Sequence, residues 1–359
     1  MPRLRRADCS SPGIRRRRQG RGFSYVWEDS GERVSESEIL DRITGLVLPP
    51  AWQDVWICPF PNGHLQAVGT DALGRKQYRY HDDWRTRRDN EKFEAMVDFA
   101  RSLPELRLVV EEQLSVSSEL SRDRVLACAV RLLDRGFFRI GTEVGRSGDL
   151  ETFGLTTMRK EHVSIAGNEV AFEYLAKGGK HRIHSVVDPA VTEIITALKR
   201  RRSGGDELLA YRAGDAWVDI AARDVNAWLK EATGGDFSAK DFRTWSATVL
   251  AARALAVSGL AASSASARKR AEARAAQEVA HYLGNTPTVA RNSYIDPRVY
   301  DRYRSGWTIL PALTQLSEVD ELDEVTLHSE IESAVLELLS DNTDSDAIEH
   351  VDEVAALAS

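Results

Sequence analysis

The apolar residues of this chain change their spacing near residue 88, and this change divides the chain into two folding units. From Phe23 to Trp84 they form short runs typical of β-strands, such as "FSYVW", "DVWICPF", "HLQAVGT" and "KQYRYH", with Pro, Asn and Gly between them. One segment, "SESEILDRITGLVLPP", has helical spacing and ends at two prolines, which predicts one helix. We therefore expect residues 23–88 to form a small α+β domain with an antiparallel sheet.

Helical spacing dominates after this boundary. The stretch "RTRRDNEK" (85–92) is strongly polar and predicts a solvent-exposed connection, after which apolar residues recur every three or four positions. Strand-like alternation returns in "EVAFEYLA", and the following "KGGK" places two glycines before a second such run, which predicts a β-hairpin. Residues 89–306 are expected to be mainly helical with one small hairpin sheet, and the chain as a whole is expected to be α+β.

The charges are distributed unevenly along the chain. The net charge is −7, but no Lys or Arg follows Arg304, and 14 acidic residues lie between Glu318 and Glu353. Residues 1–304 hold all 48 basic residues and the other 41 acidic ones, which gives that part a net charge of +7. A basic body of this kind favours binding to a polyanion.

The two ends of the chain differ in composition from the rest. Residues 1–22 are rich in Arg, Gly and Ser and include the run Arg15–Arg18, so we expect a flexible tail with at most a nonspecific, salt-sensitive role. Residues 307–359 are expected to form an acidic tail of unknown partner, whose simplest role is to aid solubility. One amphipathic helix is predicted in it from the spacing of its apolar residues, Ile331, Val335, Leu338 and Leu339.

Several classes of protein are disfavoured. No run approaches eighteen apolar residues, so we expect no membrane span, and no apolar segment follows the basic N-terminus as in a secretory signal. Cys9, Cys58 and Cys128 have neither disulfide nor metal-ligand spacing, which fits a reducing cytoplasm. The histidines also lack paired spacing, and there is no phosphate-binding glycine loop, so we expect neither a metal nor a nucleotide cofactor.

Four short stretches carry residues suited to phosphate chemistry. They are "FFRIGTE", "LAKGGKHR", "SAKDFRTW" and "YLGNTPTVARNSYID". Taken singly, each basic residue in them is more often a solvated charge. In the third stretch, however, two cations share the first turn of a helix with Ser238 as a plausible N-cap, where the helix dipole disfavours them. The candidate residues of the four stretches are Arg139, Lys177, Lys240, Arg243, Asn285 and Tyr294.

Taken together and in this order, the four stretches resemble the type IB DNA topoisomerases of the small poxvirus and bacterial branch. The resemblance extends from about Gly22 to Gly306. It implies a catalytic domain of the kind that topoisomerases IB share with tyrosine recombinases, and a cytoplasmic (nucleoid-associated) monomer that clamps double-stranded DNA. The implied activity is relaxation of supercoils through transient cleavage of one strand, a 3′-phosphotyrosyl intermediate, strand rotation and religation, without ATP or metal.

The resemblance assigns a role to each candidate residue. Tyr294 would attack the phosphorus, and the guanidinium groups of Arg139 and Arg243 would clamp the nonbridging oxygens. Lys177 on the hairpin would protonate the leaving 5′-oxygen with help from Lys240. Asn285 would bind a phosphate oxygen.

The chain departs from the family pattern at two places. Poxvirus and eukaryotic members carry His where this chain has Asn285, so proton transfer is not expected there, and nearby His281 is expected to be a structural or surface residue. The segment Gly141–Gly148 also differs from its poxvirus counterpart. We therefore do not expect the strict cleavage-site preference of the poxvirus enzymes.

A second part of the resemblance lies in the first domain. The stretch "DALGRKQYRYH" is similar to the strand with which the N-terminal domain of this branch contacts DNA. Its basic and amide groups can hold phosphates or pair with base edges, although the same pattern also fits an ordinary exposed edge strand. The DNA-binding candidates are Arg75, Lys76, Gln77, Tyr78 and Tyr80.

Two other functions stay open. A tyrosine recombinase would use the same nucleophile, but its usual pattern is H-x-x-R, whereas this chain has Lys240 and Arg243 in that spacing. A DNA-binding protein that keeps the fold without catalysis is the other alternative, and the complete set of Arg, Lys, Arg, Asn and Tyr argues against it.

Overall fold

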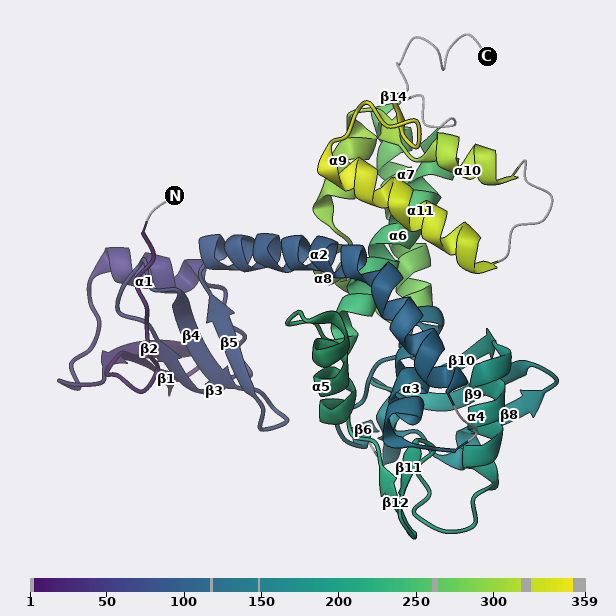
Figure 1. The fold of residues 1–359 in the computed structure, drawn as a ribbon. Coiled ribbons are helices and arrows are strands. Elements are labelled where there is room, and N and C mark those ends of the chain that lie inside the picture. The colour runs from purple at the N-terminus through teal and green to yellow at the C-terminus, as the bar shows by residue number, and fades with distance from the viewer. Residues whose placement is uncertain (1–2, 117–118, 148, 260–263, 318–323, 351–359) are drawn as a thin grey trace. The chain divides into compact units, whose positions relative to one another are not determined.

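A computed structural model describes residues 3–116, 119–147, 149–259, 264–317 and 324–350 (Figure 1). The chain forms two compact units, Met1–Glu94 and Ala95–Ser359. No helix in the described ranges is both long and apolar enough to cross a membrane.

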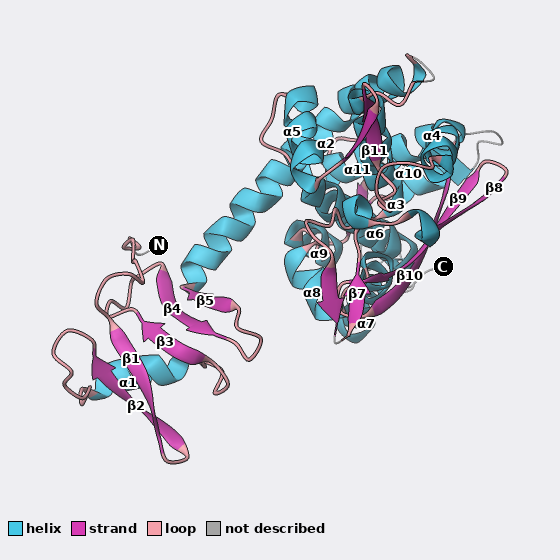
Figure 2. Ribbon diagram, turned by 90° about the horizontal axis from the view of Figure 1, so that it is seen from below, coloured by secondary structure: helices cyan, strands magenta, loops and turns pink. Residues whose placement is uncertain are grey.

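The N-terminal unit is built on a five-stranded antiparallel sheet with the strand order β2-β1-β3-β4-β5. Helix α1 (Ser37–Gly45) lies against this sheet (Figure 2) and buries Ile43 in a core that also contains Ile14, Val55 and Ile57. The predicted small α+β domain is therefore confirmed. The strands are β1 (Ile14–Gln19), β2 (Gly22–Trp27), β3 (Gln53–Ile57), β4 (Leu65–Thr70) and β5 (Lys76–Tyr80).

The expectation that residues 1–22 form a flexible tail is wrong for the described part of this segment. Strand β1 contains the run of arginines and pairs with both β2 and β3. Ile14 is fully buried, Arg15 forms an ion pair with Glu28 at 2.6 Å, and Arg16 donates to the carbonyl oxygen of Trp52 at 2.6 Å. Composition indicated disorder because the run of arginines carries no sign that β2, directly after a short turn, and the more distant β3 pair with it.

Helix α2 (Asp82–Ser115) connects the two units. The stretch 85–92 is largely exposed, as expected of a connection, but it is helical and not a loop. Ion pairs between neighbouring helical turns stabilise it, such as Arg88 with Glu91 at 2.8 Å. The boundary between the units lies at Glu94, a few residues beyond the predicted one.

The C-terminal unit is mainly helical, as predicted. After α2 its helices are α3 (Arg122–Gly136), α4 (Pro189–Arg200), α5 (Ala222–Thr233), α6 (Ala239–Gly259), α7 (Ala265–Leu283), α8 (Pro287–Ser293), α9 (Pro297–Arg304), α10 (Leu310–Ser317) and α11 (Glu324–Ser340), with short 3-10 turns η1 (Leu155–Thr157) and η2 (Lys160–His162). The predicted hairpin is present and gains a third strand, in the order β10-β9-β8. Its strands are β8 (Val163–Ala166), β9 (Glu169–Ala176) and β10 (Lys180–Val187).

Three two-stranded ladders complete the described part of the C-terminal unit, and together these elements confirm the α+β class. The ladders are β6 (Gly145–Ser147) with β7 (Leu150–Thr152), β11 (Ala210–Ala213) with β12 (Ala216–Asp219), and β13 (Trp307–Thr308) with β14 (Glu349–His350).

Helix α3 is the centre of this unit. All its residues from Arg124 to Leu133 are buried, and it contacts α4, α5, α6, β10 and β11, as expected of a helix surrounded by other elements. The Ser121 hydroxyl caps its N-terminus by accepting from the N–H of Arg124. The helix ends where Phe137 takes a left-handed conformation (φ 55°), which turns the chain sharply. This turn sets the position of the two residues that follow.

The acidic segment 307–359 differs from the expected tail. The predicted helix is present as α11, with Ile331, Val335, Leu338 and Leu339 buried, and it packs on α6, α9 and α10 (yellow in Figure 1). Strand β13 pairs with β14, which ties Trp307 to His350. Residues 307–317 and 324–350 are therefore part of the C-terminal unit, and residues 318–323 and 351–359 lie outside the described residues.

Candidate active site

Tyr294 lies at the junction of two short helices. Helix α7 ends at Gly284, which takes the left-handed conformation (φ 65°) common at helix C-termini. Thr286 caps α8 by accepting from a backbone N–H, and Pro287 occupies the first helical position. Tyr294 is the C-cap residue of α8, and after two more residues α9 begins at Pro297. The turn that carries Asn285 and the candidate nucleophile are thus the two ends of one helix of two turns.

Helix α6 holds the main chain directly after the Tyr294 side chain. The Thr248 hydroxyl lies 3.4 Å from the carbonyl oxygen of Tyr294 and accepts from the N–H of Asp296 at 3.2 Å. Ile295, between them, is fully buried. The ring of Tyr294 is packed near Arg243, whose Cζ lies 5.4 Å from the ring centroid. The backbone of the candidate nucleophile is therefore fixed by the same helix that supplies this arginine.

Arg243 is held by the ends of two other helices. Its Nη1 donates to the carbonyl oxygen of Phe137 at 2.5 Å, and its Nη2 donates to that of Leu283 at 2.9 Å. The first carbonyl follows α3 and the second ends α7, so the negative ends of two helix dipoles face the cation. Burial, and next the charge of Arg139, lower the pKa of Arg243 to about 10, while Tyr294 acts in the opposite direction. A guanidinium with this pKa is still charged at neutral pH.

Arg139 and Asn285 meet beside this arginine. Arg139 follows α3, and its Nη2 donates to the side-chain oxygen of Asn285. The carbonyl oxygen of Arg139 accepts from the N–H of Leu155 at 2.8 Å, which holds its main chain in place. The Nδ2 atom of Asn285 is buried and has no hydrogen-bond partner among the described residues. This orientation leaves amide donors beside two arginines, a suitable arrangement for the oxygens of a phosphate.

These charges act on the phenol of Tyr294. Burial alone would raise its pKa, because the charged form is poorly solvated in the interior. The positive charges of Arg243, Arg139 and Lys240 outweigh burial, so the pKa of Tyr294 is lowered from its ordinary value. The site therefore favours the phenolate, the more nucleophilic form of this side chain.

The two candidate lysines are placed differently from the arginines. Lys240 lies exposed on the first turn of α6, one helical turn before Arg243, as predicted. Ser238 directly precedes α6, and its hydroxyl and N–H both donate to Asp241. Lys177 is exposed in the turn between β9 and β10, and it forms no hydrogen bond or ion pair within the described ranges. The structure thus brings Tyr294, Arg243, Arg139 and Asn285 together and leaves Lys177 at the tip of the hairpin.

Two basic residues that we did not single out in the sequence attach this hairpin to the Asn285 turn. The Nζ atom of Lys180 donates to the carbonyl oxygen of Asn285 at 3.0 Å. Arg182 donates to the last carbonyls of α7, those of His281 at 2.8 Å and Tyr282 at 2.5 Å. The sequence contained a usable signal, since the two cations are two residues apart on a predicted strand and therefore share one face. The side chain of His281 itself is exposed.

Two uncharged side chains, those of Tyr174 and His184, lie near Arg182 and Arg243. Tyr174 is buried, and burial raises its pKa to about 12, opposed in part by the charges of Arg182, Arg243 and Arg139. His184 packs against Phe138, with ring centroids 4.9 Å apart. Burial, and next the charges of Arg182 and Arg243, lower the pKa of His184 to about 4. Both rings are therefore uncharged at neutral pH and add no competing charge below the arginines.

In the N-terminal unit, β5 is an edge strand, as its pattern allowed. Asp71 accepts from the side chains of Arg75 and Gln77, both at 2.9 Å, and hydrogen bonding from Arg75 lowers the pKa of Asp71 to about 2. Tyr78 and Tyr80 stack on each other with ring centroids 6.1 Å apart. Lys76 is exposed on the same side of the strand as these two tyrosines. The five DNA-binding candidates thus lie on one exposed strand and the turn before it.

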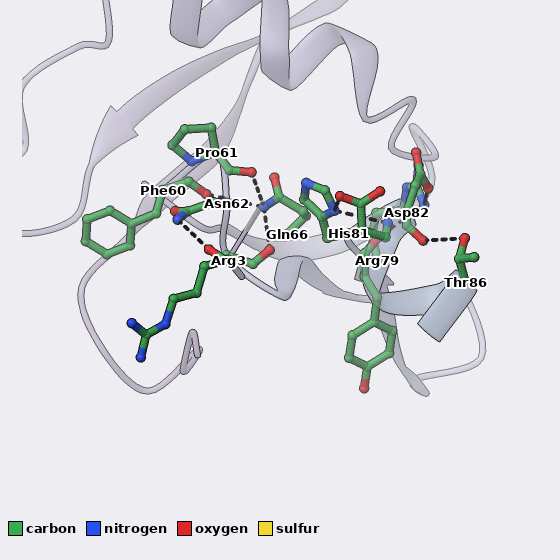
Figure 3. Close-up of polar contacts among 12 residues, drawn as sticks. Arg3, Phe60, Pro61, Asn62, Gln66, Arg79, His81, Asp82 and Thr86 are labelled. Carbon is green, nitrogen blue, oxygen red and sulfur yellow. Dashed lines mark hydrogen bonds and ion pairs between the residues drawn. The ribbon is translucent and has the colours of Figure 1, made fainter. Parts of the chain in front are cut away.

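Polar contacts fix the loop before β4 and the junction between β5 and α2 (Figure 3). The buried Gln66 side chain donates to three carbonyl oxygens of the loop before β4, those of Phe60, Pro61 and Gly63. At the end of β5, Arg79 donates to Asp82 at 2.9 Å, and the carbonyl oxygen of Asp82 accepts from Thr86. The strand therefore passes into α2 with a fixed geometry.

Comparison with known proteins identifies the family of the chain. Residues 81–308 match the family model described as eukaryotic DNA topoisomerase I, catalytic core, and residues 22–71 match that of the bacterial DNA topoisomerase IB N-terminal domain. The chain is also 29% identical over 302 residues to the DNA topoisomerase 1B of Acanthamoeba polyphaga mimivirus. These aligned residues cover 82% of this chain and 88% of the viral protein. The first match contains the whole candidate site. The chain therefore belongs to the type IB DNA topoisomerases, a family of isomerases that act on DNA.

Proposed function

We propose that this protein relaxes supercoiled duplex DNA by cutting one strand through Tyr294, letting that strand rotate, and rejoining it. The observation that carries this proposal is the position of the Tyr294 phenol, beside Arg243 and the Arg139–Asn285 pair. Two fixed cations and a free amide donor beside a phenol of lowered pKa form a site for attack on a phosphodiester.

In the cleavage step the phenolate oxygen of Tyr294 forms a bond to phosphorus, and the bond from phosphorus to the 5′-oxygen breaks. The phenol proton leaves to solvent, and the leaving 5′-oxygen takes a proton from Lys177. Negative charge grows on the nonbridging oxygens, where the guanidiniums of Arg139 and Arg243 and the amide of Asn285 stabilise it. The products are a 3′-phosphotyrosine and a 5′-hydroxyl.

Religation is the reverse of this step. The 5′-hydroxyl attacks the phosphotyrosine, Lys177 removes its proton, and Tyr294 leaves with the same groups stabilising the charge. One phosphodiester is exchanged for another of similar energy in each direction, so the reaction needs no ATP. Supercoils are released by rotation of the cut strand between the two steps.

The roles of the lysines rest on their placement. Lys177 lies in a turn with Gly178 and Gly179, both at positive φ, and this flexible glycine turn suits a side chain that reaches bound DNA. Lys240 acts through its charge on Tyr294 and supports Lys177. Because type IB enzymes act on duplex DNA, we assign a second DNA-binding surface of the protein to β5 of the N-terminal unit. We also propose that the protein works as a monomer.

The test uses negatively supercoiled plasmid in EDTA without ATP, with the wild-type protein and Tyr294→Phe side by side. We expect relaxation by the wild type and a covalent protein–DNA adduct after a denaturing quench, both absent with Tyr294→Phe. An adduct without relaxation would instead indicate a recombinase-like cleaving enzyme. Folded protein that shifts DNA on a gel but gives neither product would refute the proposed chemistry.

A further inference from the structure

The buried carboxylate of Glu332 contacts two different helices of the C-terminal unit. Glu332 lies on α11, beyond residue 308, where the match to the topoisomerase catalytic core ends. Its side chain is 6% exposed. One oxygen accepts from the indole N–H of Trp245 at 2.7 Å, and the other accepts from Nη1 of Arg107 at 2.6 Å. Helix α11 is thereby bound to α6 and α2 through a single residue.

Glu332 is held in the ionised form. Burial would raise its pKa, but hydrogen bonds from His328 and Arg107 outweigh burial and lower the pKa of Glu332 to about 2. Two charge-assisted bonds from Arg107, at 2.6 and 3.1 Å, and one bond from the Trp245 indole converge on its two oxygens, so the carboxylate has a defined position for each of these three N–H groups.

The Arg107 contact leads to one support of Arg243. Arg107 also forms a bidentate pair with Asp134, with both hydrogen bonds at 2.9 Å. Asp134 lies in the last turn of α3, three residues before Phe137, whose carbonyl oxygen accepts from Arg243. The chain of contacts from Glu332 through Arg107 and Asp134 therefore ends at the carbonyl that holds Arg243.

The Trp245 contact leads to Arg243 itself. Trp245 follows Arg243 by two positions in α6, and its side chain is 1% exposed. An α-helix turns about 100° per residue, so these two side chains lie on roughly opposite faces of α6. A hydrogen bond that fixes Trp245 therefore sets the rotation of α6 about its axis and, with it, the direction in which Arg243 points.

We propose that Glu332 is a positioning residue for Arg243, which it aligns from both sides, through Trp245 on α6 and through Arg107 and Asp134 at the end of α3. The closed ring of contacts makes α11 a functional part of the catalytic domain. This inference rests on the proposed role of Arg243 as a phosphate clamp.

Geometry is the contribution we assign to Glu332, because an ion pair is a poor source of stability alone. Apolar side chains of similar volume commonly hold helices together as well as a buried pair does. The carboxylate adds two separate anchor points at fixed angles. Displacement of a catalytic group by about 1 Å can cost about 10²-fold in rate, so the loss of one anchor is measurable.

The test compares Glu332→Gln and Trp245→Phe in the full-length protein. Glu332→Gln removes the negative charge that faces Arg107, and Trp245→Phe removes the indole N–H. For both we expect single-turnover cleavage to slow about 10- to 100-fold, with an unchanged dissociation constant for DNA. The matched control is Glu330→Gln, the same change at an exposed position of α11, which we expect to cleave like the wild type.

Combination with Arg243→Lys separates positioning from a general loss of structure. Residues that act as a unit show non-additive losses, so Trp245→Phe is expected to slow the Arg243→Lys enzyme much less than it slows the wild type. The inference would be refuted if the losses of Trp245→Phe and Arg243→Lys multiply in full in the double variant. It would also be refuted if Glu332→Gln and Trp245→Phe both cleave at the wild-type rate. Wild-type cleavage by Arg243→Lys would instead refute the clamp role itself, so the two failures are distinguishable. If Glu332→Gln does not fold, Trp245→Phe alone and in combination with Arg243→Lys tests whether the contact positions Arg243.

Discussion

The Nζ atom of Lys180 lies 3.0 Å from the carbonyl oxygen of Asn285 and donates a hydrogen bond to it. This contact joins the hairpin that carries Lys177 to the turn that carries the amide donor. The turn that carries Asn285 is also held without Lys180, by backbone hydrogen bonds and by the caps of the helices at its two ends. One of these bonds joins the Asn285 N–H to the carbonyl oxygen of Ala280 at 2.9 Å. The tip of the hairpin has fewer supports. Loss of Lys180 is therefore expected to displace Lys177 and leave Asn285 in place.

A substrate with sulfur in place of the bridging 5′-oxygen tests this directly. A thiolate leaves without a proton, so the general acid becomes unnecessary. On ordinary DNA we expect Lys177→Ala to slow cleavage about 10²- to 10⁴-fold, and Lys180→Met to slow it less. Sulfur is expected to restore most of both losses. His181→Gln is the control, since its side chain pairs with Glu173 on the hairpin surface. A Lys180→Met defect that sulfur does not correct would contradict a role through Lys177.

Asn285 is expected to bind phosphate without moving a proton. Asn285→Ala removes the unpaired Nδ2 donor, and we expect cleavage to slow about 10²- to 10³-fold, as for the loss of one donor to a developing oxyanion. Asn285→His keeps an N–H donor and should retain much more activity. His281→Ala serves as the comparison, because only the backbone carbonyl of His281 contacts the hairpin. Equal losses in Asn285→Ala and His281→Ala, in folded proteins, would show that the assignment is wrong.

The sequence predicted the features that depend on neighbouring residues. The hairpin followed from alternation and two glycines, and the helix of segment 324–340 followed from apolar spacing at Ile331 and Val335. Four of the six catalytic candidates are adjacent in the structure. Each motif is set by a local turn or helix end, such as the Gly284 C-cap before Asn285, and the family resemblance of the four motifs together implied that they form one site.

Features that depend on distant partners were missed. Strand β1 lies inside the sheet because β3 also pairs with it, with Ile14 opposite Ile57, and nothing within the run of arginines indicates that partner. Lys180 meets a carbonyl 105 positions away, and Glu332 meets an indole 87 positions away. Charge composition described segment 307–359 as an acidic tail because it cannot show that one of those charges, Glu332, is buried against Arg107.

Asp188 is expected to contribute strongly to stability. Its carboxylate is 3% exposed, caps α4 by accepting from the N–H of Val191, and pairs with Arg131 at 3.2 Å and Arg135 at 3.0 Å. Asp188→Ala removes the carboxylate that Arg131 and Arg135 share, and among the described residues it leaves the buried Arg131 with the largely exposed Glu111. We expect a loss of about 3–5 kcal/mol in the free energy of unfolding.

Urea denaturation followed by tryptophan fluorescence measures this loss. Asp188→Asn keeps the capping oxygen and is expected to lose less. Asp215→Asn is the control, because its carboxylate is exposed and pairs with the half-exposed Arg212, and we expect a change within about 0.5 kcal/mol. An Asp188→Ala protein as stable as this control would contradict the prediction.

Lys76 is expected to contact a DNA phosphate from the edge strand β5. Its ammonium is exposed, whereas Asp71 already neutralises the neighbouring Arg75 at 2.8 Å. Each phosphate contact contributes about 0.9 to the slope of log affinity against log salt concentration, so Lys76→Met should reduce the slope by about that amount. Arg21→Met changes an exposed residue outside β5 and is expected to leave the salt dependence of DNA affinity unaltered. An unchanged slope for Lys76→Met would place the DNA elsewhere.

The lowered pKa of Tyr294 predicts the pH dependence of cleavage. If the phenolate attacks, the rate rises with pH up to the pKa of Tyr294 and then levels off. Lys240 is one of the charges that lower this pKa, so Lys240→Met raises it and moves the rising limb to higher pH. The variant is therefore expected to be slower below the limb and to approach the wild-type rate on the plateau.

Single-turnover cleavage measured across this pH range distinguishes the two roles considered for Lys240. A displaced limb with a preserved plateau shows that Lys240 acts through the charge of Tyr294. An equal loss at every pH would instead assign it to proton delivery alongside Lys177. Lys230→Met is the matched control, since Lys230 lies on α5, pairs with Asp236 and is not among the charges that act on Tyr294. Its profile should coincide with that of the wild type, because neither the charge nor the solvation of the phenol changes.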